Sequence, residues 1–224
     1  MESVVLSSGG LDSAVLLAHE AQRARVHPVY ISVGLAWEDA ELTVLQELLN
    51  APVFSDRVQP LVALDFTMRD LLAPSHWAIR GTPPAYDTPD EDVYLPGRNV
   101  VLITKGAVLA VARGCRRLTL GTLSNNPFPD ATPHFFEAMS HALSLGLGQF
   151  IEIAAPLAGM GKDDVIRLGD SLDVPLERTL SCMNPHANGQ PVHCGLCSKC
   201  RERRDAFTAA AVLDRTSYAN PVPR

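Results

Sequence analysis

The sequence lacks an uninterrupted hydrophobic run long enough to cross a membrane. Its longest apolar stretch, residues 100–112 (VVLITKGAVLAVA), contains Lys105 and is shorter than the roughly 20 residues that a membrane-spanning helix needs. No basic segment precedes the apolar residues 3–7, which are followed at once by polar residues and glycine. We therefore expect no secretory leader, no membrane partner and a cytoplasmic location.

An excess of positive charge is also missing. The chain has 19 Lys and Arg against 25 Asp and Glu, a net charge of −6, which argues against a general nucleic-acid-binding surface. One local basic run, Lys199, Arg201, Arg203 and Arg204, is left, and its plainest interpretation is a solvated helix face. The hydrophobic content of 46% excludes a disordered chain, and 224 residues suit one domain, alone or with a small appendage.

Cysteine is scarce but unevenly placed. Of five cysteines, Cys182, Cys194, Cys197 and Cys200 follow the spacing C-x11-C-x2-C-x2-C, whereas Cys115 stands apart and is expected to be buried. An odd number with four crowded together suits a reducing compartment and a metal site better than disulfides. Four thiolates match the ligand set of structural zinc, and a [4Fe–4S] cluster is the alternative. The nearby His186 and His193 are interpreted as loop residues.

What the chain does contain is an alternation of strand-like and helix-like segments. Five apolar runs are expected to form strands: 3–7, 26–34, 61–66, 117–122 and 150–157. Segments with apolar residues at helical spacing lie between them: 11–24, 36–49, 98–114 and 134–146. This order predicts an α/β fold with a doubly wound, Rossmann-like parallel sheet. Proline-rich residues 74–97 are expected to form a long loop, residues 181–200 to be irregular unless a metal organises them, and the tail from Ser217 to be frayed.

The segment SSGGLDS, residues 7–13, joins the first expected strand to the first helix. Gly9 and Gly10 allow backbone N–H groups to approach an anion, and the helix directs its free N–H groups to the same point. An ordinary turn with a Ser or Asp cap is the alternative. A complete Walker A sequence is absent, because Asp163 follows Gly161-Lys162 and Pro156 occupies the first glycine position. The loop resembles the pyrophosphate loop of ATP pyrophosphatases, which cleave ATP between the α and β phosphates.

Further motifs extend this resemblance over most of the chain. They are YLPGRN at 94–99, FPD at 128–130, APLAGMGKDDVIRLGDSLDVP at 155–175, TLSCM at 179–183 and CGLCSKCRERRDAF at 194–207. Together with SSGGLDS, they resemble the 7-cyano-7-deazaguanine synthase family of the queuosine precursor pathway. The resemblance implies an adenine nucleotide alpha hydrolase-like domain at 1–176, a small zinc-binding segment with four cysteine ligands at 177–216 and a tail at 217–224. We also expect a homodimer.

The resemblance further implies an ATP-dependent ligase. In that family a carboxylate on 7-deazaguanine is adenylated, ammonia forms the amide, and a second ATP drives dehydration to the nitrile. The implied cofactors are ATP, Mg²⁺ and structural Zn²⁺, with Lys162, Arg98 and Asp12 as catalytic residues. The expected nucleotide-binding residues are Ser7, Ser8, Gly9, Gly10, Leu11, Asp12, Ser13, Arg98, Asn99, Gly121 and Asp130, of which Asp130 would bind the purine-like ring.

Two segments depart from the family pattern. SVGLAWEDAEL stands where a GQRH-like segment is usual, and FPDATPH lacks the Cys and Arg of a Tyr-Pro-Asp-Cys-Arg stretch. The acceptor chemistry therefore has alternatives: an enzyme that stops at the amide, or one that joins the deazaguanine to another amine, including one on a protein partner. RNA thiolation and a non-catalytic nucleotide-binding module are further alternatives.

Overall fold

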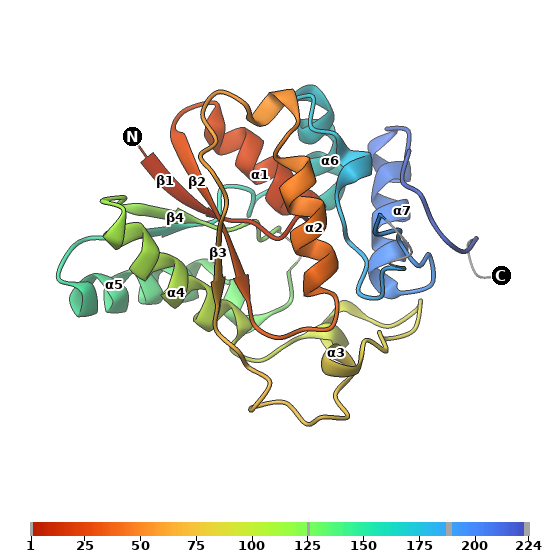
Figure 1. Cartoon of the computed structure of the whole chain (residues 1–224), viewed down its shortest axis with the longest axis horizontal. Helices are drawn as coiled ribbons and strands as arrows, with labels where there is room; N and C mark the ends of the chain where they lie inside the picture. The colour runs from red at the N-terminus through yellow and green to blue at the C-terminus, as the bar shows by residue number, and fades with distance from the viewer. Residues whose placement is uncertain (1, 125, 187–189, 222–224) are drawn as a thin grey trace.

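Five parallel strands form a single sheet in the order β3-β2-β1-β4-β5 (Figure 1). The computed structural model describes residues 2–124, 126–186 and 190–221. The strands are β1 (Glu2–Leu6), β2 (Arg25–Ser32), β3 (Val62–Asp65), β4 (Arg117–Thr119) and β5 (Glu152–Ala154). Val4 and Val5 of β1 are fully buried, because helices cover both faces of the sheet. The predicted doubly wound α/β fold is confirmed, although β5 is shorter than expected.

The helices divide between the two faces of the sheet (Figure 1). They are α1 (Leu11–Ala21), α2 (Glu38–Leu48), α3 (Trp77–Arg80), α4 (Arg98–Ala112), α5 (Pro133–Leu147), α6 (Lys162–Ser171) and α7 (Ser198–Ala210). Helices α4 and α5 pack on one face, while α1 packs on the other with α6 against it. The short helix α3 lies within the segment expected to be a loop. None of the helices in the described ranges has the length and apolar character needed to cross a membrane.

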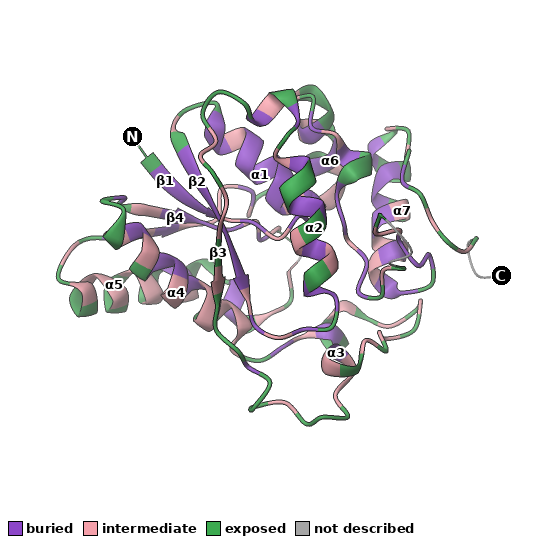
Figure 2. Ribbon diagram, viewed as in Figure 1, coloured by how far each residue is buried: buried purple, intermediate pink, exposed green. Residues whose placement is uncertain are grey.

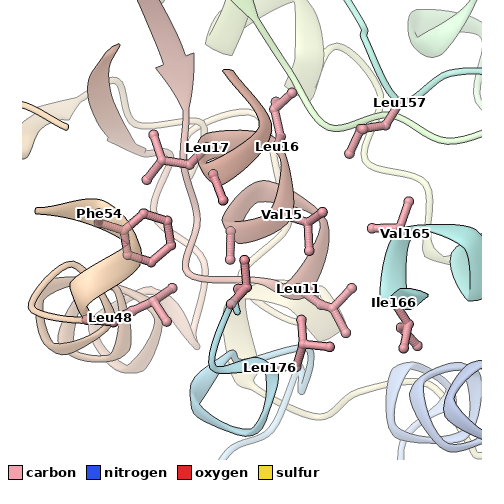
Figure 3. Close-up of a cluster of buried hydrophobic side chains, with 14 of the residues drawn as sticks. Leu11, Val15, Leu16, Leu17, Leu48, Phe54, Leu157, Val165, Ile166 and Leu176 are labelled. Carbon is pink, nitrogen blue, oxygen red and sulfur yellow. The ribbon is translucent and has the colours of Figure 1, made fainter. Parts of the chain in front are cut away.

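The core beside α1 fixes the relative position of α1 and α6. Buried side chains from both helices meet there with those of α2 and α7 (Figures 2 and 3). Gly169 of α6 allows the close approach: a Cβ atom at this position would lie 2.7 Å from Val15 Cγ2 and 2.8 Å from Leu176 Cδ2. The first residue of α6, Lys162, is thereby brought to the amino-terminal end of α1.

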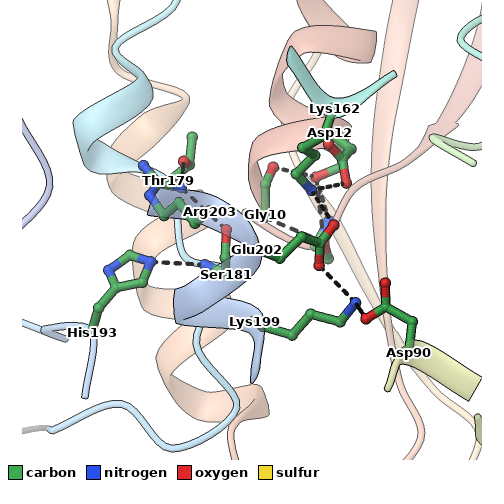
Figure 4. Close-up of polar contacts among 12 residues, drawn as sticks. Gly10, Asp12, Asp90, Lys162, Thr179, Ser181, His193, Lys199, Glu202 and Arg203 are labelled. Atoms are coloured by element: carbon green, nitrogen blue, oxygen red, sulfur yellow. Dashed lines mark hydrogen bonds and ion pairs between the residues drawn. The ribbon is translucent and has the colours of Figure 1, made fainter. Parts of the chain in front are cut away.

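Helix α7 is held to the body of the protein by its basic residues. Arg203 is completely buried and donates hydrogen bonds to Thr179, Ser181, Thr216 and the carbonyl of Leu176. The interpretation of the basic run as a solvated helix face is therefore wrong, because Arg203 is buried and the three partly exposed members of the run, Lys199, Arg201 and Arg204, bind other groups of the protein. Figure 4 shows Arg203 next to Thr179 and Ser181.

The tail also differs from its expectation. The N–H of Ala219 donates to the carbonyl of His193, and Arg204 binds the carbonyl of Asn220 and lies 3.9 Å from the ring centroid of Tyr218. The expectation of fraying from Ser217 is thus wrong for residues 217–220, which pack against the cysteine segment. Residues 222–224 lie outside the described part of the chain.

Candidate functional site

Two adjoining cavities open where β1 and β4 end. Their volumes are about 440 and 220 Å³, and both are lined by Ser8, Gly10, Asp12, Arg98 and Gly121. Strand order reverses direction between β1 and β4, which is where open α/β sheets bind their ligands. Every residue expected from the sequence to bind nucleotide or act in catalysis lines one or both cavities, except Gly9 and Asp130.

The loop between β1 and α1 forms a tight turn that leads into the uncapped amino-terminal end of α1. Gly9 has a φ of +74°, and a Cβ atom there would lie 2.9 Å from the carbonyl oxygen of Glu41, so only glycine fits. Ser13 Oγ accepts from the N–H of Ser8 at 3.1 Å and donates to the carbonyl of Gly10 at 3.0 Å, which fixes the turn. Gly10 is the N-cap of α1 and has no side chain to cap it, so the helix presents free N–H groups to the cavity.

Lys162 and Asp12 meet at the mouth of this loop (Figure 4). Lys162 Nζ lies 2.6 Å from Asp12 Oδ2 and 3.6 Å from Glu202 Oε1, and its side chain is only 18% exposed. Burial opposes the charge of Lys162, but Asp12 and Glu202 outweigh it and raise the pKa of Lys162 above its usual value. The lysine is therefore a cation at neutral pH, placed beside an anion-binding loop.

Three buried polar atoms around the cavities have no hydrogen-bond partner within the described residues. They are Asp12 Oδ1, Arg98 Nε and Thr122 Oγ1. Buried polar atoms are normally paired, so unpaired atoms of both charges lining one cavity indicate a ligand that is polar and charged. A carboxylate oxygen is also the ligand that Mg²⁺ prefers, and Asp12 Oδ1 is free to serve as one.

Asn99 and Asp130 form a structural pair. Asp130 Oδ2 accepts from the N–H of Asn99 at 3.2 Å, and Asn99 Nδ2 donates to the carbonyl of Asp130 at 3.0 Å. Asp130 is buried and lies outside the lining of both cavities. Asp130 thus fixes the start of α4, next to Arg98. The expected contact of Asp130 with the purine-like ring stays a prediction.

The larger cavity has one aromatic wall. The rings of Trp37 and Trp77 stack with centroids 5.7 Å apart at 8°, and Phe128 also lines the cavity. Such a wall suits the flat face of a heterocycle. Neither tryptophan was predicted as a site residue, because Trp37 lies in the segment that departs from the family pattern and Trp77 lies in the segment expected to be a loop.

Four charged lining residues were likewise not identified: Glu41, Asp90, Lys199 and Glu202. Burial, opposed by Arg98 and Tyr30, raises the pKa of Glu41 to about 7. Lys199 Nζ lies 2.7 Å from Glu202 Oε2 and 2.9 Å from Asp90 Oδ1. One feature of the sequence could have pointed to Glu41: it lies on the apolar side of its amphipathic helix, together with Val44, Leu45 and Leu48.

The four clustered cysteines lie together and are buried. Three Sγ separations are 4.0 Å (Cys182 to Cys197), 3.9 Å (Cys194 to Cys200) and 3.5 Å (Cys197 to Cys200). Four thiolates around one zinc ion at about 2.3 Å would be about 3.8 Å apart, so this set fits a single tetrahedral ion. The N–H groups of Cys194 and Asn184 donate to Cys182 Sγ, as expected of a sulfur that carries negative charge. Residues 187–189 of this segment lie outside the described ranges.

Known proteins resemble this chain over nearly its whole length. A 7-cyano-7-deazaguanine synthase of Methanobrevibacter smithii is 30% identical over 97% of both chains, and one of Methanothrix thermoacetophila is 32% identical over 96% of this chain and 98% of its own. Among solved structures, a predicted subunit of a tRNA methyltransferase from Methanocaldococcus jannaschii aligns at 20% identity over 76% of each chain, with a TM-score of 0.46. The family model described as "Queuosine biosynthesis protein QueC" matches residues 2–211, and the chain belongs to this family.

Proposed function

We propose that this protein is an ATP-dependent ligase that converts 7-carboxy-7-deazaguanine and ammonia to 7-cyano-7-deazaguanine. The single observation that carries the proposal is the site: Lys162, Asp12 and Arg98 surround an anion-binding loop in a member of the QueC family. The product is proposed from the relatives, which are named 7-cyano-7-deazaguanine synthases.

The loop from Ser8 to Ser13 holds the β and γ phosphates of ATP through its N–H groups and the amino-terminal end of α1. This leaves the α phosphorus open to attack by a carboxylate oxygen of the substrate. Lys162 and Arg98 stabilise the negative charge that develops on the phosphates. Mg²⁺, held by Asp12, would neutralise phosphate charge when it is bound.

The atoms balance over two molecules of ATP. The carboxylate displaces pyrophosphate from the first ATP, and ammonia then displaces AMP from the acyl-adenylate to give the amide. The amide oxygen displaces pyrophosphate from the second ATP, and loss of AMP with two protons from the nitrogen leaves the nitrile. Both carboxylate oxygens of the substrate therefore leave in AMP.

The two cavities suit the two heterocycles of this reaction. Val29, Ile31, Leu102 and Leu120 give the 220 Å³ cavity an apolar lining, which suits the adenine of ATP. The 440 Å³ cavity, with the Trp37–Trp77 pair, suits the deazaguanine ring, and Lys162, which also lines it, would meet the substrate carboxylate and the α phosphate there.

The cysteine set is proposed to hold one structural zinc ion. The Sγ separations of 3.5 to 4.0 Å support this, because a four-iron cluster is larger than one ion and would hold its thiolates further apart.

The proposed organisation of the protein is a nucleotide-binding domain at 1–176, a zinc segment at 177–216 and a tail at 217–224, in a homodimer. None of the five cysteines forms a disulfide, which suits the reducing cytoplasm.

The alternatives differ in their products. RNA thiolation is not favoured, because Lys199 and Arg203 of the local basic run are bound to Asp90, Glu202 and Thr179 of the protein itself. Incubation with ATP, ammonia and 7-carboxy-7-deazaguanine, followed by mass spectrometry, is expected to show the nitrile. Accumulation of the amide, or of a deazaguanine adduct on a protein, would replace the nitrile-forming proposal with one of the other acceptor reactions.

A further inference from the structure

A chain of alternating charges runs from the phosphate loop to helix α7. Asp12 pairs with Lys162, Lys162 with Glu202, Glu202 with Lys199, and Lys199 with Asp90 (Figure 4). All five side chains line the 440 Å³ cavity. The middle of this chain, Glu202, is a carboxylate placed between two lysines.

The position of Glu202 is fixed from several directions. Its neighbour Arg203 is fully buried by four hydrogen-bond acceptors, which fixes the rotation of α7 about its axis. Lys199, one turn earlier on α7, holds Glu202 Oε2 at 2.7 Å and is itself held by Asp90. With Oε2 occupied, Oε1 is the oxygen that faces Lys162, at 3.6 Å.

Lys162 needs a second carboxylate for the reaction described above. In the present arrangement its shortest contact is with Asp12, at 2.6 Å. If Asp12 held Mg²⁺ when ATP is bound, its contact would no longer hold the ammonium group. A lysine has a flexible stem and three N–H donors, so without another partner it would lose its direction. Glu202 belongs to α7 and not to α1, and its Oε1 lies 3.6 Å from Lys162 Nζ, so it can hold the ammonium group independently of Asp12.

We propose that Glu202 is a positioning residue that holds the Lys162 ammonium group toward the phosphates during adenylation. This inference rests on the proposed function. It assigns to α7, which also carries Cys200, a part in the chemistry at the phosphate loop. A displacement of about 1 Å in a reacting group can cost roughly a hundredfold in rate, so removal of this carboxylate is expected to lower turnover rather than ATP affinity.

The test compares Glu202→Gln, Glu202→Asp and the control Asp205→Asn, whose exposed carboxylate lies on the same helix. AMP formation from ATP and 7-carboxy-7-deazaguanine is measured over a range of ATP concentrations. We expect Glu202→Gln to lower kcat roughly tenfold to a hundredfold with less than about a threefold change in the KM for ATP. Asp205→Asn is expected to match the wild type. Wild-type kcat in Glu202→Gln, or a change in KM alone, would overturn the inference.

Glu202→Asp keeps the charge but moves it back by one methylene group. Its kcat is expected to lie between those of the wild type and Glu202→Gln. An Asp variant no more active than the Gln variant would show that Lys162 does not depend on this charge, and would also overturn the inference.

A second measurement separates this inference from the proposed function. Acetic anhydride labelling of the ATP-free protein, followed by peptide mass spectrometry, reports on the Lys162 amine whether or not the protein adenylates anything. We expect Lys162 to be labelled several times faster in Glu202→Gln, with Lys105 of α4 labelled at its wild-type rate. Equal Lys162 rates would contradict the inference, whereas a wild-type protein that forms no AMP would contradict the proposed function alone.

Discussion

Lys162 Nζ and Asp12 Oδ2 lie 2.6 Å apart although 150 positions separate the two residues in the sequence. Asp12 lies in the first turn of α1 and Lys162 is the first residue of α6. The two helices meet side by side at Gly169, so their amino-terminal ends converge on one point. A positive side chain, a negative side chain and two helix amino termini thus share the mouth of one cavity.

Replacement of Lys162 by Ala is expected to lower turnover roughly a hundredfold, because a charge-stabilising donor is lost from the transition state. ATP affinity is expected to change much less, since the loop N–H groups still hold the phosphates. Steady-state kinetics and equilibrium titration of ATP measure the two effects separately. Lys105→Ala, a lysine of α4 outside both cavities, is the control. Equal losses of binding and turnover in Lys162→Ala would assign the residue to ground-state binding instead.

Ser13→Ala removes the hydroxyl that accepts from the N–H of Ser8 and donates to the carbonyl of Gly10. The turn then loses its internal fixation, and we expect ATP affinity to fall roughly tenfold to a hundredfold, about 1.5–3 kcal/mol. Isothermal titration with ATP gives the value directly. Ser171→Ala, at an exposed position of α6, is expected to bind ATP like the wild type. Wild-type affinity in Ser13→Ala would show that the loop is only a structural turn.

The four clustered cysteines predict the metal content of the purified protein. Anaerobically purified protein is expected to contain about one zinc ion per chain by elemental analysis. Cys197→Ser is expected to lose the metal and to expose α7 to proteolysis, because the proposed ion would join α7 to the preceding segment. Cys115→Ser, whose thiol is buried elsewhere, is expected to keep its zinc. Iron with acid-labile sulfide in the wild-type protein would contradict the assignment.

The raised pKa of Glu41 predicts how the free energy of unfolding depends on pH. Burial raises its pKa from 4.5 to about 7, so the folded protein retains a proton that the unfolded chain releases. The free energy of unfolding therefore declines as the pH rises between about 4.5 and 7 and levels off above that range, with a contribution from Glu41 of about 3 kcal/mol. The Gln side chain of Glu41→Gln cannot titrate, so this variant is expected to lose that part of the decline in the free energy of unfolding. Denaturant titrations at pH 5 and at pH 8 measure the decline. Glu137→Gln, at an exposed position of α5, is expected to retain it; an unchanged decline in Glu41→Gln would contradict the assignment.

The sequence predicted those parts of the molecule that depend on local pattern. Val4, Val5 and Leu6 form the apolar run that predicted the buried strand β1, and Gly9 with Gly10 marks the turn between β1 and α1. The cysteine spacing alone identified the set that lies within contact distance in the structure. Lys162 was recognised only through the resemblance to a known family, because no local pattern places it near Asp12.

The remaining charges of the site were not predicted because their surroundings are tertiary. Lys199 and Arg203 were interpreted as part of a solvated helix face, yet Asp90 and Glu202 bind the first and residues 176–181 and Thr216 enclose the second. Glu41 occupies a position on the apolar side of its helix, but its hydrogen-bond partner Tyr30 lies on a different element, so the sequence alone could not show how the carboxylate is held. Periodicity reports which face of a helix is apolar, whereas the partners of a buried charge come from elements far away in the sequence.

The most direct test of adenylation follows oxygen atoms. The substrate 7-carboxy-7-deazaguanine, labelled with ¹⁸O in both carboxylate oxygens, is converted in the presence of unlabelled ATP, ammonia and water, and the nucleotides are analysed by mass spectrometry. If the carboxylate and then the amide oxygen attack the α phosphorus, each nitrile is accompanied by two AMP molecules that each carry one ¹⁸O, together with unlabelled pyrophosphate. Formation of ADP and phosphate, or of AMP without label, would contradict the proposed reaction at its first step.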